Sequence, residues 1–268
     1  MLLGKEIYIF FAQYGLNGIY GILVSCILFS IVIYKVFSIC CEKHILTYTD
    51  FLDFILGEKL EKLKLNFLIN TIINLFLLIS FFIMISGFGA FLKQELNIPY
   101  LIGIILICIL CYITFNKNVE GITKVNLLLT PLLIFFIILI GIVNYFHICS
   151  NNISLNIPDN NSFISLINGI VYCSYNSIVM IPILISLKKY LEPKNILKIS
   201  VISSFILFIL SITVFSILFT IDIDINYIDL PLIYATSILG ILFEILYSFV
   251  FLSAVFTSAI SARIWISN

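Results

Sequence analysis

Residues 163–187 read FISLINGIVYCSYNSIVMIPILISL, a run without a single Asp, Glu, Lys or Arg. A helix needs about 20 apolar residues to cross the hydrocarbon core of a bilayer. Several more runs of this kind follow one another in the chain, which has 268 residues and is 62% hydrophobic and 10% charged. Soluble domains carry about 25% charged residues, so this composition excludes a water-soluble globule. Only helices and closed barrels span lipid, and no alternating barrel pattern occurs. The sequence therefore predicts an all-α polytopic membrane protein.

The uncharged runs, trimmed at their polar ends, predict seven transmembrane helices in one transmembrane domain, 1–268. Between the first two, segment 47–65 alternates apolar and charged residues, which predicts a short amphipathic stretch on the membrane surface. The predicted spans cover residues 15–36, 66–91, 99–115, 125–146, 163–187, 199–220 and 232–262.

The positive charges predict the orientation of these helices. Only Lys5 and Lys93 fall outside one set of alternating connections. The others lie in that set or in the C-terminal tail: Lys35, Lys43, Lys59, Lys62, Lys64, Lys117, Lys124, Lys188, Lys189, Lys194, Lys198 and Arg263. Because cytoplasmic loops carry the excess of Lys and Arg, we expect the N-terminus outside and the C-terminus inside. The 14 basic and 14 acidic residues balance, so no field for binding nucleic acid is expected.

The predicted fifth span carries unusual polarity near its middle. Tyr172, Ser174, Tyr175 and Asn176 lie close to the expected bilayer midplane. Glycine precedes them and Pro182 follows, a pattern that predicts a broken helix at 163–187 with freed backbone groups. Secondary transporters build substrate sites from such helices, so these four residues are predicted to bind substrate. The alternative is an ordinary helix whose polar side chains bond to their neighbours.

The predicted seventh span contains candidates for ion coupling. Glu244 is an acid inside an otherwise uncharged run, and it could carry a proton or serve as a structural hydrogen-bond partner. Thr257 and Ser258 are adjacent hydroxyls, hard oxygen ligands of the kind that sodium requires. No other cofactor is expected.

Chemistry of other kinds is not indicated. The seven cysteines lie scattered, mostly inside apolar runs, where cysteine behaves as a small hydrophobic residue. No metalloprotease, nucleophile-elbow, P-loop or Rossmann motif occurs. We therefore do not expect an enzyme.

Four segments together resemble the YkvI family of bacterial membrane proteins, a distant branch of the amino acid–polyamine–organocation transporter superfamily. The matching residues lie within 4–18, 86–99, 172–176 and 255–259, in the family's order. The resemblance implies part of a LeuT-like inverted repeat in a bacterial cytoplasmic membrane. It also implies that Tyr172 to Asn176 form an unwound segment and that Thr257 and Ser258 match a sodium-binding position. Relative to the family pattern, we expect a chain truncated at both ends.

Two functions follow as hypotheses. The first is a secondary transporter, or a remnant of one, that moves a small organic solute across the bilayer by ion-coupled alternating access. The second is a non-transporting membrane sensor or assembly subunit, in which the same polar groups only join helices.

Overall fold

The fold is that of a computed structural model, which describes residues 4–56, 65–115, 120–151, 162–219 and 230–266. All regular elements in these ranges are helical. They are α1 (Lys5–Phe10), η1 (Ala12–Asn17), α2 (Gly18–Glu42), α3 (Tyr48–Leu56), α5 (Leu65–Leu96), α6 (Tyr100–Phe115), α7 (Glu120–Asn151), α8 (Ser162–Leu187), η2 (Lys188–Tyr190), η3 (Pro193–Asn195), α9 (Ile196–Leu218), α10 (Pro231–Leu239) and α11 (Ile241–Ile266).

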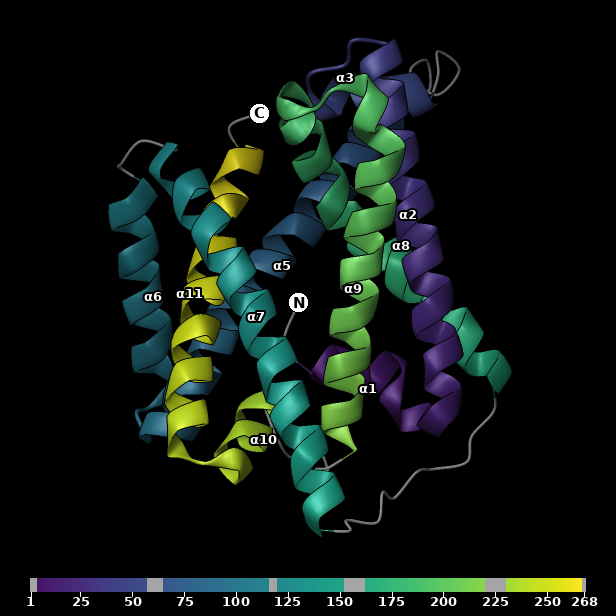
Figure 1. The fold of residues 1–268 in the computed structure, drawn as a ribbon. Helices are drawn as coiled ribbons and strands as arrows, with labels where there is room; N and C mark the ends of the chain where they lie inside the picture. The colour runs from purple at the N-terminus through teal and green to yellow at the C-terminus, as the bar shows by residue number, and fades with distance from the viewer. Residues whose placement is uncertain (1–3, 57–64, 116–119, 152–161, 220–229, 267–268) are drawn as a thin grey trace.

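The long helices form two groups that meet along α7 and α9 (Figure 1). In one group, α2 packs along both α8 and α9. In the other, α11 packs against α5, α6 and α7. The short helices α1 and α10 both contact α9. Buried Phe11, Tyr172 and Phe251 belong to one large apolar core cluster.

The composition of these helices confirms the membrane prediction. Four are long and apolar enough to cross a bilayer: Ala12–Glu42, Leu68–Leu96, Ser162–Leu187 and Pro193–Leu218. Shorter apolar helices, Tyr100–Ile113, Thr130–Phe146 and Ile241–Phe256, lie within the other three predicted spans. Large apolar side chains remain exposed along these helices, as expected where lipid is the solvent.

The predicted break at 163–187 is wrong, because α8 runs without interruption from Ser162 to Leu187 and through Pro182. Several of its polar side chains hydrogen-bond to carbonyls one turn earlier in the same helix. The Ser174 hydroxyl donates to the carbonyl of Ile170 at 2.8 Å, and the Ser177 hydroxyl donates to that of Cys173 at 2.7 Å. Such bonds satisfy polar groups within a regular helix.

The predicted single span 232–262 is also wrong, because the chain turns at Gly240 between α10 and α11. Gly240 has φ 119°, a conformation that favours glycine. Pro231 begins α10, a position at which proline costs no hydrogen bond. The run is uncharged apart from Glu244, but it is not continuously helical.

The lysine-rich connections that are described meet at one end of the molecule. The Lys188 ammonium donates to the carbonyl of Ile45 at 3.2 Å, which joins the α8–α9 connection to the α2–α3 connection. The predicted amphipathic segment 47–65 begins with α3, which buries Phe51 and exposes Phe54 and Ile55. Residues 57–64 lie outside the described ranges. This end of the bundle is the upper end in Figure 1.

Candidate functional site

A helix interruption lies at residues 11–17, not in α8 as predicted. Helix α1 ends at Phe10, and Phe11 has φ −132° and ψ −55°. Gly15 has φ 62° and ψ −149°, values essentially confined to glycine. The chain then continues as α2. Phe11 and Gly15 are both buried, so the interruption lies within the packed bundle.

Helix α8 supplies a partner for this interruption. The Asn168 amide donates to the carbonyl of Phe10 at 3.3 Å, at the residue where α1 ends. Side-chain donors of this kind replace the missing bonds of a helix terminus. Close contact between α2 and α8 holds the arrangement, since a Cβ on Gly169 or Gly21 would meet backbone of the other helix closer than 3.0 Å.

A carboxylate from α1 lies beside two tyrosines of α8. The Tyr175 hydroxyl donates to Oε1 of Glu6 at 3.1 Å. Within the described part of the chain, Oε2 of Glu6 and the hydroxyl of Tyr172 are buried without a hydrogen-bond partner. A buried polar atom left unpaired costs about 1–3 kcal/mol. These two atoms can therefore accept a partner that the chain itself does not provide.

Aromatic rings pack against the two tyrosines beside this carboxylate. Phe10 and Phe11 lie 5.3 and 5.1 Å from Tyr172, centroid to centroid. Phe76 of α5 lies 5.5 Å from Tyr175, edge to face. Such ring pairs stabilise packing beyond their buried area, by about 0.5–1.5 kcal/mol each. The interruption, Glu6 and these rings together form the candidate site.

Of the four residues predicted to bind substrate, the structure places two at this site. Tyr172 and Tyr175 face α1. Ser174 is exposed and bonds within its own helix. The Asn176 amide donates to the carbonyl of Tyr172 at 2.9 Å, again within α8.

The candidates for ion coupling lie elsewhere. Glu244 is in the first turn of α11, not deep in a span, because the helix begins only after Gly240. Its carboxyl group lies near that of Glu95 at the end of α5. Thr257 and Ser258 belong to α11, but their side chains lie outside the described residues. No group of three potential metal ligands occurs among the residues that the structure describes.

Glu6 is a part of the site that was not predicted. Glu6 precedes the first uncharged run, so a search for spans leaves it outside the membrane. In the sequence, Glu6 stands out as the single acid in the short, otherwise apolar stretch EIYIFFA at 6–12. An acid among apolar and aromatic residues next to a glycine-containing segment is the pattern that would have identified it.

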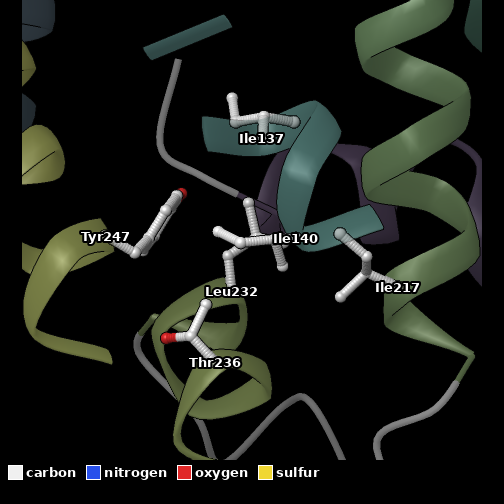
Figure 2. Close-up of a pocket in the computed structure, with 6 residues that line it drawn as sticks. All are labelled: Ile137, Ile140, Ile217, Leu232, Thr236 and Tyr247. Atoms are coloured by element: carbon white, nitrogen blue, oxygen red, sulfur yellow. The ribbon is translucent and has the colours of Figure 1, made fainter. Parts of the chain in front are cut away.

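A second feature is a narrow gap between α7, α9, α10 and α11. Figure 2 shows the side chains around it, among them Leu232 and Thr236 of α10 and Tyr247 of α11. The Tyr247 hydroxyl is buried without a partner in the described chain. The space is too narrow for a water molecule, so it does not provide a solute site.

The helices and their apolar composition define a multi-pass helical membrane protein. The chain is similar to the uncharacterized membrane protein YkvI of Bacillus subtilis (strain 168), with 31% identity over 137 residues. The match covers 50% of this chain and 37% of that relative, so the similarity spans well under half of the relative's length. It confirms the resemblance that the sequence segments indicated. No protein-family profile matches the chain. No solved structure matches it.

Proposed function

We propose that this chain forms part of a carrier for a small organic solute, with the solute site between the interrupted segment 11–17 and α8. The observation that carries the proposal is the Glu6 carboxylate, bonded to Tyr175 through one oxygen and buried without a partner through the other. Acids within a membrane bundle are costly and generally serve substrate or ion pathways. A solute or coupling ion that pairs with this oxygen would remove the cost.

The interrupted helix supports the same proposal. Irregular backbone at membrane depth is tolerated where it is buried in protein or lines a cavity. Here Asn168 holds the carbonyl at the end of α1, and the conformation of Gly15 permits the chain to resume as α2. Such a segment can change its backbone angles without unfolding the long helices, as alternating access requires.

The remaining parts of the proposal concern coupling and location. Transport would be coupled either to protons through Glu244 or to sodium through Thr257 and Ser258, with no other cofactor and no enzymatic step. The protein would lie in the bacterial cytoplasmic membrane with its lysine-rich end inside. The N-terminus would then be outside and the C-terminus inside.

The alternative function is a sensor or assembly subunit that does not transport. It is favoured by the internal hydrogen bonds of Ser174, Asn176 and Ser177, which give these groups a purely structural role. On this alternative the Glu6–Tyr175 bond only joins α1 to α8.

Uptake into proteoliposomes separates the two functions. The purified protein would be reconstituted with an imposed sodium or proton gradient and offered a panel of radiolabelled amino acids, amines and carboxylic acids. We expect Glu6→Gln and Tyr175→Phe to lower uptake at least tenfold, because both alter the group that meets the solute. The matched controls Glu192→Gln and Ser174→Ala change exposed side chains and should retain uptake.

Each variant needs a folding check by thermal unfolding in detergent. Folded protein without flux of any solute under either gradient would support the sensor or assembly subunit. Normal uptake by folded Glu6→Gln would remove the proposed site.

A further inference from the structure

A groove of about 290 Å³ lies at the lysine-rich end of the molecule, away from the site above. One wall is the end of α2, and the other is η3 with the start of α9. The lining residues are Tyr34, Ser38, Cys41 and Glu42 on α2 and Pro193, Lys194, Ile196 and Leu197 opposite.

The depth of this groove is set by two membrane spans. Ala12–Glu42 ends at it, and Pro193–Leu218 begins at it. The ends of apolar spans lie where hydrocarbon gives way to lipid headgroups. The groove therefore lies at headgroup level, on the same side as α3.

Opposite charges face the groove from its two walls. Glu42 and Lys194 are both exposed, and no hydrogen bond or ion pair between them is found among the described residues. Tyr34 and Ser38 add hydroxyl groups on the α2 wall. A ligand that carries a phosphate and an ammonium group would meet a partner for each charge.

An apolar track leads from the groove toward the middle of the membrane. On α2, the exposed side chains of Ile27 and Ile31 continue the line of Tyr34. On α9, Val201 and Phe205 continue the line of Leu197 at four-residue spacing and are 52% and 60% exposed. Residues three or four apart share a helix face, and α2 packs against α9. This track fits an acyl chain.

We propose that the groove binds a phospholipid whose headgroup carries a primary ammonium, of the ethanolamine type. The phosphate pairs with Lys194, the ammonium donates to Glu42, and an acyl chain follows the α2–α9 track. A glycerol headgroup lacks the cation, so it leaves Glu42 unpaired beside a second negative charge. A choline headgroup has no N–H with which to donate to the carboxylate.

Native mass spectrometry of the delipidated protein tests this binding. The probes are dioleoyl phosphatidylethanolamine and dioleoyl phosphatidylglycerol at equal concentration. We expect the ethanolamine lipid to be retained about threefold more, the ratio that one exposed charge pair supplies. Glu42→Gln should abolish the preference, and Lys194→Gln should lower retention of both lipids. Asp50→Asn and Lys93→Gln, which change charges away from the groove, are the matched controls.

Three results would overturn the proposal. The first is equal retention of the two lipids by the unmodified protein. The second is an undiminished preference for the ethanolamine lipid in Glu42→Gln. The third is a loss of lipid retention in the control variants as large as that in Glu42→Gln and Lys194→Gln. Water-soluble glycerophosphoethanolamine forms a further arm. If it binds as well as the lipid, the acyl track has no role and the ligand is not a bilayer lipid. Because retention is measured without a solute, failure here is distinct from failure of the transport proposal.

Discussion

Glu6 and Gly15 are single residues that determine the candidate site in different ways. Glu6 provides the charge, and Gly15 provides the backbone conformation that brings α1 against α8. A side chain at φ 62° and ψ −149° is strained whatever space surrounds it. The chemistry and the geometry of the site therefore depend on residues that lie nine positions apart in the sequence.

Gly15→Ala tests the geometric contribution. We expect it to lower the free energy of unfolding by about 1–3 kcal/mol, because alanine cannot adopt this conformation without strain. Chemical unfolding in detergent micelles measures the change. Leu16→Ala alters the neighbouring, exposed side chain and should change stability by less than about 0.5 kcal/mol. An equal loss of unfolding free energy in Gly15→Ala and Leu16→Ala would show that a side chain at position 15 does not strain the backbone.

At the scale of elements, α2 and α8 approach each other closely in the site. Glycines at 21 and 169 allow the two backbones to approach, as small residues do at helix interfaces in membranes. An added methyl group at either glycine meets backbone, which cannot move aside as a flexible side chain can.

Gly169→Ala should therefore separate these helices. We expect a loss of about 1–3 kcal/mol in unfolding free energy, the usual cost of overpacking. The control Val171→Ala removes a lipid-exposed side chain from the same helix and should have little effect. Thermal unfolding of both variants in detergent measures the difference, and an unchanged melting temperature in Gly169→Ala would contradict the packing described.

Helix α3 gives a pH-dependent prediction. Burial raises the pKa of the Tyr48 phenol to about 12, from an ordinary value near 10. Burial favours the neutral phenol in the folded protein. The contribution of the buried Tyr48 phenol to the free energy of unfolding is therefore complete below pH 10 and is lost as the pH rises through 12. Melting temperatures should fall more steeply above pH 10 in the unmodified protein than in Tyr48→Phe. Parallel curves for the two proteins would contradict this account of Tyr48.

The sequence predicted the helical elements better than their interruptions. Apolar runs identify spans because lipid excludes charge, so the long helices were found, although the ends of α2, α5 and α7 differ from the predicted ones by up to six residues. The break in α8 was wrongly predicted because bonds such as that from Ser174 to the Ile170 carbonyl are invisible in composition. The turn at Gly240 was missed for the complementary reason, since a glycine in an apolar run does not reveal its φ angle. Tyr172 and Tyr175 were predicted at the site, but their partner Glu6 was not.

At the scale of the whole molecule, orientation is the property most open to test. Leu46 lies at the lysine-rich end and is 73% exposed, and Asn97 lies in the α5–α6 connection. In a cysteine-free background, Leu46→Cys should react with a membrane-impermeant maleimide only in inside-out vesicles. Asn97→Cys should react in intact cells. The reverse pattern would contradict the orientation, and labelling of both residues from one side would contradict the fold.

The bond between Asn168 and the Phe10 carbonyl joins residues 158 positions apart. During synthesis, α1 leaves the ribosome long before α8 exists, so this bond can form only after α8 has been made. Until α8 has been made, the Glu6 side chain must be accommodated at the bilayer surface or inside the insertion machinery. Premature arrest of translation before α8 should therefore leave α1 without this partner and open to proteases.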